Sequence, residues 1–86
     1  MKTLKNNDLV QVIEDEEAFY KIVSNNVKKF RKKYNYTQLD FSANIGFNSV
    51  SFYCDCENNK NEKHFNLLHI VRIAKFLNID INELIN

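Results

Sequence analysis

The clearest pattern along the chain is helical. From residue 16 onward, apolar residues recur three or four positions apart, with lysine and asparagine between them. The first such series consists of Ile22 or Val23, Val27, Phe30 and Tyr34. Asp15 stands where a helix N-cap would lie, and Asn35 can take the left-handed conformation that ends a helix. The pattern predicts a first helix between these two residues.

Two short helices and a turn are predicted in the middle of the chain. A Thr-x-x-Asp run beginning at Thr37 resembles a capping box and predicts a helix over residues 37–44. Asn48 can cap a second helix over residues 49–56. Between them lies Gly46, and a chain with one glycine is expected to need it where the backbone φ is positive.

The C-terminal part of the chain is predicted to be a polar loop followed by helix. Residues 57–65 show no apolar pattern and are typical of a loop. Asn66 can cap a helix over residues 66–77, in which apolar side chains cover most of the circumference. Asn78 can end this helix, and a last helical turn or two is expected after Asp80.

The N-terminal residues are harder to interpret. The run Leu9-Val10-Gln11-Val12-Ile13 fits either a short strand or an apolar arm that packs on another surface. The length of 86 residues suits one domain. We therefore predict an N-terminal arm, residues 1–15, and one all-α domain, residues 16–86.

Composition excludes several classes of protein. No apolar run approaches the roughly 18–20 residues needed to cross a bilayer, and the acidic N-terminus is unlike a signal peptide. Two cysteines do not make a disulfide scaffold. A cytoplasmic protein without a membrane partner is expected.

The net charge of +1 conceals an uneven distribution. Residues 1–20 carry two lysines against five acidic residues, a net charge of −3, whereas residues 21–86 carry ten basic against six acidic residues, a net charge of +4. Five of those ten cations lie between Lys28 and Lys33. This cluster fits a surface that faces a polyanion, although a solvated helix face has the same composition.

The two predicted short helices form a helix-turn-helix over about residues 37–56. With the flanking segments VKKFRKK and LLHIVRIAKFLNIDINELI, this region resembles the lambda-repressor-like family of DNA-binding domains (Cro/repressor, XRE-type). The matching features are Arg31, Gln38 directly after Thr37, Ile45-Gly46-Phe47 and the run from Ala74 to Asp80. The resemblance implies a five-helix, all-α domain that binds operator DNA as a homodimer and regulates transcription, as a repressor.

The resemblance also implies site residues. The positions expected to read base edges are Gln38, Ser49, Val50, Tyr53 and Cys54, and those expected to contact the DNA backbone are Arg31, Lys32, Lys33, Thr37, Asn48 and Ser51. Cys56 stands where the family has a glutamate that pairs with the arginine at position 31, and Asp55 or Glu57 can take that role. The second short helix has few long polar side chains, so weak or shape-dependent specificity is expected.

Other functions find less support. Cys54-x-Cys56 with His64 and His69 is the only metal-like cluster, but residues two apart point to different faces of a helix, so no metal or other cofactor is expected. The sequence shows no phosphate-binding glycine loop or catalytic grouping, so no enzyme is predicted. The alternative is an antitoxin or adaptor that retains the fold and binds a protein partner, such as a toxin or another regulator. The wide apolar surface of residues 66–77 and the apolar arm predict a homodimer.

Overall fold

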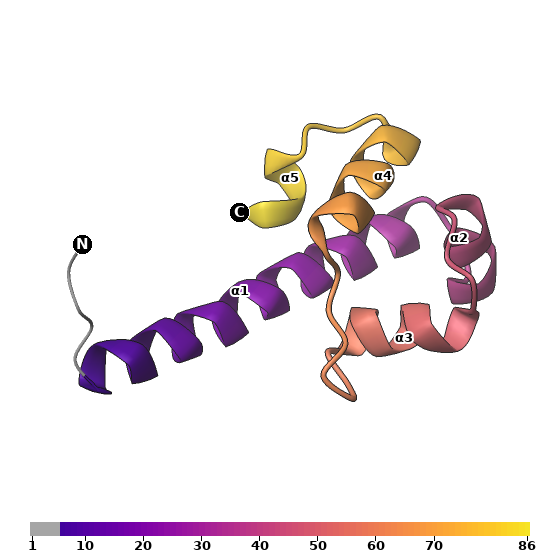
Figure 1. Ribbon diagram of the computed structural model, residues 1–86. Helices are drawn as coiled ribbons and strands as arrows, with labels where there is room; N and C mark the ends of the chain where they lie inside the picture. The colour runs from indigo at the N-terminus through magenta and orange to yellow at the C-terminus, as the bar shows by residue number, and fades with distance from the viewer. Residues whose placement is uncertain (1–5) are drawn as a thin grey trace.

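The computed structural model describes residues 6–86, and all of its regular elements are helices (Figure 1). They are α1 (Asn6–Lys33), α2 (Gln38–Asn44), α3 (Val50–Asn58), α4 (Leu67–Leu77) and α5 (Asn82–Ile85). The prediction of an all-α chain is confirmed for this part of the sequence. Within these 81 residues, no helix is both long enough and apolar enough to cross a membrane.

The first helix is longer than predicted. It begins at Asn6 rather than near residue 16, so the run from Leu9 to Ile13 is helical and the prediction of a strand there is wrong. Asp15 lies inside the helix and accepts a hydrogen bond from Gln11 Nε2 at 3.1 Å. The β-branched residues of this run favour a strand locally, but no proline or glycine separates them from the helical pattern that follows. The five residues before Asn6 lie outside the described part of the chain.

The helix ends are set by side-chain caps and by asparagines in the left-handed conformation. Thr37 Oγ1 accepts from the backbone N–H of Asp40 at 3.1 Å, as predicted. Asn66 and His69 form a reciprocal capping box at the start of α4. The residues that follow α1, α3 and α4 with positive φ are Asn35 (φ 62°), Asn59 (φ 52°) and Asn78 (φ 54°). In a chain with one glycine, asparagine ends these helices because its short side chain tolerates this conformation.

The turn between α2 and α3 is one residue longer than predicted. Gly46 adopts a φ of +78°, as expected, but the N-cap of α3 is Ser49 instead of Asn48. The hydroxyl of Ser49 accepts from the backbone N–H of Phe52 at 3.1 Å. Helix α3 consequently covers residues 50–58 and not 49–56.

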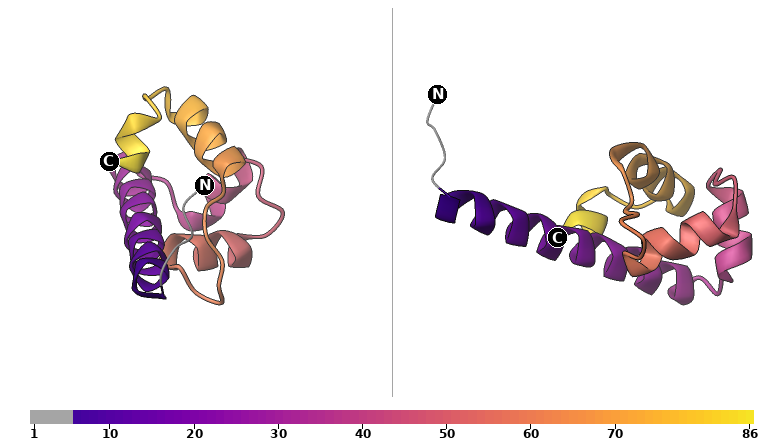
Figure 2. Two further views of the ribbon diagram at one scale, coloured as in Figure 1. Left: turned by 60° about the vertical axis from the view of Figure 1, so that its left-hand side comes forward. Right: turned by 60° about the horizontal axis from the view of Figure 1, so that its bottom comes forward.

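The hydrophobic core lies between the C-terminal half of α1 and the other four helices. Each helix contributes to it, and its fully enclosed members include Val27, Phe41, Tyr53, Ile73 and Leu84. Asn26 Nδ2 ties α5 to α1 by donating to the carbonyl oxygens of Leu84 and Asn86 at 2.9 and 3.0 Å. The N-terminal half of α1 extends away from this core (Figures 1 and 2).

Candidate nucleic-acid interface

A buried ion pair holds the helix-turn-helix, α2 and α3, against the end of α1. Arg31 Nε and Nη2 donate to the two carboxylate oxygens of Glu57 at 2.9 and 3.0 Å, and Nη1 donates to the Tyr36 carbonyl at 2.8 Å. The hydroxyl of Tyr53 and, at 3.3 Å, the amide of Gln38 also donate to this carboxylate. The network joins α1, the link before α2, α2 and α3 through one side chain.

The protonation states of this network are fixed by its geometry. Burial by itself would raise the pKa of Glu57, but hydrogen bonds from Arg31 and Tyr53 outweigh it and lower that pKa below its ordinary value. The hydrogen bond to Glu57 raises the pKa of Arg31, against the opposing effect of burial. Burial raises the pKa of Tyr53, and the adjacent carboxylate raises it further. The pair is therefore ionised and the phenol neutral at physiological pH.

Three of the predicted site residues belong to this network. Of the two acidic candidates for pairing with Arg31, Glu57 is the one that does so. Arg31 is only 8% exposed and donates three hydrogen bonds within the chain, so little of its side chain is accessible for the predicted contact with a DNA backbone. Tyr53 is 0% exposed, so it does not flank a base-reading surface. Gln38 is half-buried and has its amide nitrogen occupied, which leaves its carbonyl oxygen as the free group.

The outward face of α3 differs from the predicted one because of the longer turn. Ser51 and Asn58 are exposed, and Val50, Cys54 and Asp55 are half-buried beside them. Ser51, expected to contact the backbone, thus lies on the outer face of the helix. Ser49, expected to read bases, uses its hydroxyl as the N-cap. The signal in the sequence is the pairing of Glu57 with Arg31, because Tyr53, one helical turn before Glu57, then faces the core as well.

The cations lie around the helix-turn-helix and not on it. Residues 34–59 contain no lysine or arginine and three acidic residues. Lys32 and Lys33 are exposed at the end of α1, next to the N-terminus of α2, where Thr37 forms the cap and is itself exposed. Asn48 is exposed in the turn.

Four further cations near the helix-turn-helix were not singled out by the sequence reasoning. Lys60 and Lys63 are exposed in the loop that follows α3. Arg72 and Lys75 line a shallow depression of about 420 Å³ with the turn, and Arg72 Nη1 lies 3.5 Å from where a Cβ of residue 46 would be. Arg72 and Lys75 are far from α2 and α3 in the sequence, so only the fold places them at this site.

The predicted metal-like cluster does not come together. Cys56 is enclosed in the core and its Sγ donates to the carbonyl of His64 at 3.5 Å, whereas Cys54 is half-buried on a different side of α3. Burial raises the pKa of the Cys56 thiol to about 11, which disfavours the thiolate that a metal needs. In the part of the chain that the structure describes, no three histidine, cysteine, aspartate or glutamate side chains could hold a metal ion.

The surface described by these residues is a short helix with small, mostly uncharged side chains, set on a rigid base and bordered by lysines and arginines. Such a helix fits the width of a DNA major groove, and the cations around it fit phosphates. Comparison of the chain with protein-family models, with curated proteins and with solved structures gives no match.

Proposed function

We propose that this chain is a sequence-specific double-stranded DNA-binding regulator of transcription, a repressor with a lambda-repressor-like fold, and that α3 is its recognition helix. The observation that carries the proposal is the rigid base formed by Arg31, Glu57 and Tyr53, which leaves the opposite face of α3 open to solvent. A helix that reads DNA bases must keep its orientation within a fraction of a helical turn, and this network supplies that rigidity.

Affinity and specificity have different sources in this proposal. Lys32, Lys33, Lys60 and Lys63 supply the phosphate contacts that set affinity and salt dependence. Base recognition falls to Ser51 and Asn58, with Val50, Cys54 and Asp55 at the edges of the same face. A carboxylate such as Asp55 can accept from the cytosine amino group, and Val50 can contact a thymine methyl.

A homodimer is part of this proposal, because one short helix per chain reads too few base pairs for a specific site. The apolar surface of α4 supports it less than the sequence suggested. Ile70, Ile73 and Ala74 are buried in the chain's own core, and Phe76 packs on Tyr36 and Phe41. The apolar residues of α4 that stay more than half exposed are Leu67 (70%) and Leu68 (55%).

Selection of bound duplexes from a random pool tests the proposal. We expect an enriched motif with two half-sites about 10 base pairs apart, and weaker binding as salt is raised. Replacing the outward Ser51 with asparagine should change the preferred base at one position of each half-site, whereas Asn25→Ser, on the solvent face of α1, should leave the motif unchanged. Failure to enrich any motif, or an unchanged motif for Ser51→Asn, would contradict the proposal.

A second candidate function is an antitoxin or adaptor that uses this fold to bind a protein. The observation in its favour is charge: residues 34–59 carry a net charge of −3, although Glu57 is neutralised by Arg31. The two functions differ in one respect that can be measured. A DNA-binding regulator needs the outer face of α3, whereas an adaptor tolerates substitutions there as long as its partner surface is intact.

A further inference from the structure

The apolar stripe of α1 continues beyond the part that the core covers. In the C-terminal half, Val23, Val27 and Phe30 recur at spacings of four and three residues, and all are at most 5% exposed. The same face continues toward the N-terminus through Phe19, which is 43% exposed. Ile13, 51% exposed, lies about 120° around the helix from Phe19. In both Figure 1 and Figure 2, no other described helix lies beside this half of α1.

An apolar groove opens where the stripe leaves the globule. Phe19 and Tyr20 form one wall of the groove, Leu67 and Ile70 of α4 form a second, and residues 81–85 form a third. Its volume is about 520 Å³. Phe19 belongs both to the stripe and to the groove, so the two make one apolar surface on which a helix of another molecule can lie.

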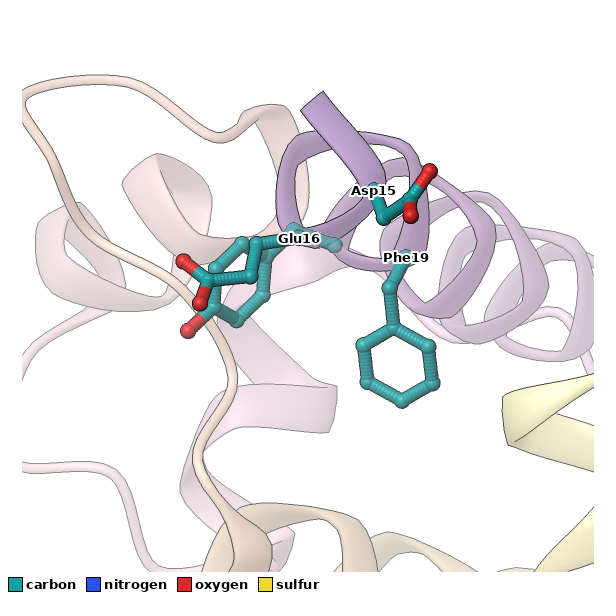
Figure 3. A pocket seen from close by; sticks show the side chains of 4 residues that line it. Asp15, Glu16 and Phe19 are labelled. Carbon is teal, nitrogen blue, oxygen red and sulfur yellow. The ribbon is translucent and has the colours of Figure 1, made fainter. Parts of the chain in front are cut away.

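Carboxylates surround this surface. Residues 6–20 contain five acidic residues and no lysine or arginine, whereas residues 21–33 of the same helix contain six cations and no acid. Figure 3 shows the Asp15 and Glu16 carboxylates pointing to opposite sides of α1, with the Phe19 ring projecting between them. By helical spacing, Glu17 lies on the flank opposite Asp15, whereas Glu14 lies on the far side of the helix from the stripe. Anionic partners, including DNA and acidic membranes, are disfavoured here.

We propose that this surface, the acidic half of α1 with the groove at its base, binds a cationic amphipathic helix of another protein. The apolar face of such a helix covers Phe19 and the groove, and its lysines or arginines meet the flanking carboxylates. A second copy of this chain fits less well, because antiparallel contact through residues 13–19 brings the two acidic clusters together. The inference does not depend on DNA binding by α3.

Three synthetic amphipathic helices serve as probes for the full-length chain. They share one leucine face and carry lysine, glutamine or glutamate on its flanks, and their binding is measured by fluorescence anisotropy. We expect the lysine peptide to bind about tenfold more tightly than the glutamine peptide and the glutamate peptide not to bind. Similar affinities for the lysine and glutamine peptides, or no binding by either, would overturn the proposal.

Variants separate a docking surface from diffuse charge attraction. Phe19→Ser, at a position that is 43% exposed, should weaken the lysine peptide about tenfold while circular dichroism shows an unchanged fold. The double variant Asp15→Asn/Glu16→Gln should weaken it several-fold, and Asp40→Asn on α2 should not. Unchanged binding by Phe19→Ser would overturn the proposal.

Sedimentation of the chain alone tests the competing occupant. A dimer that Phe19→Ser dissociates would identify a second copy on this surface and would contradict the proposal. Duplex selection with the same variant keeps the two proposals apart: the docking surface can fail while α3 still enriches a motif, and the reverse also holds.

Discussion

The two halves of α1 form one uninterrupted helix in opposite surroundings. Residues 21–33 are cationic, carry the core residues Val23, Val27 and Phe30, and contribute Arg31 to the buried ion pair. Residues 6–20 are acidic, and this part of the helix extends away from the core (Figure 1), although the apolar spacing runs through both halves. Acidic residues near a helix N-terminus and cations near its C-terminus both stabilise it through the helix dipole, so this charge arrangement allows the helix to continue past the core.

Helical periodicity in a sequence therefore locates a helix but does not indicate what covers its apolar face. In the C-terminal half, the cover comes from this chain's own helices α3 and α5. Beside the N-terminal half, no other helix of the described residues covers the apolar face. We expect the neighbouring carboxylates to determine which partner binds there. The difference between the two halves of α1, and the role of the Arg31–Glu57 ion pair at its C-terminal end, can each be tested by substitution.

The largest effect is expected at Arg31. Replacing it with alanine leaves the Glu57 carboxylate buried without its counter-ion and should lower the free energy of unfolding by about 3–5 kcal/mol. The matched change in the other half, Glu14→Ala, removes an exposed charge and should alter it by less than about 0.5 kcal/mol. Urea denaturation followed by circular dichroism measures both. Equal losses for the two variants would show that the halves do not differ as described.

A smaller difference is expected between apolar residues of the two halves. Val27→Ala removes two methyl-sized groups from an enclosed site and should cost about 2 kcal/mol. Ile13→Ala exchanges an exposed β-branched residue for a better helix former and should cost about 0.5 kcal/mol or less in the free chain. If Ile13→Ala destabilised the free chain as much as Val27→Ala, the Ile13 side chain would already be buried in the free protein.

Acid should weaken the fold through Glu57. Because the folded-state pKa of Glu57 lies below its ordinary value of 4.5, its contribution to stability is complete above about pH 4.5 and is lost as pH falls through the folded-state pKa. Glu57→Gln should be less stable at pH 7 and show a shallower loss of stability below pH 4.5. Melting temperatures from pH 7 to pH 3 measure this, and parallel curves for the two proteins would exclude Glu57 as the source.

The smallest effect is expected for single surface lysines. Lys60→Ala should leave stability unchanged, weaken binding to all duplexes alike, and reduce the slope of log affinity against log salt by about one unit. Lys21→Ala, in α1, is the matched control and should not change the slope. Equal slopes for Lys60→Ala and the parent would place the loop after α3 away from the phosphates.

Much of the fold was accessible from local sequence signals. Thr37, Gly46, Asn66 and Asn78 each have one clear role at a helix end, and the structure places each of them in it. The N-terminal boundary of α1 was not accessible in this way, because nothing in residues 6–15 stops a helix and the β-branched run there also fits a strand. Where a helical pattern contains no proline or glycine to stop it, the sequence alone does not fix where the helix begins.

The candidate site was harder to predict because it depends on register. In the structure Ser49 is the N-cap of α3, Tyr53 lies in the core and Ser51 lies on the outer face. Local caps do not decide between Asn48 and Ser49, since both residue types are good N-caps. The pairing of Arg31 with Glu57, a contact between residues 26 apart, decides it.

The central claim, that the two ends of this molecule have different partners, is tested most directly by amide chemical shifts of the full-length chain on addition of its selected duplex. We predict shifts at residues 32–33, on the outer face of α3 and at residues 60–63, with residues 8–19 unchanged until the lysine peptide is added. Shifts at residues 8–19 on adding DNA, or none on α3, would contradict the account.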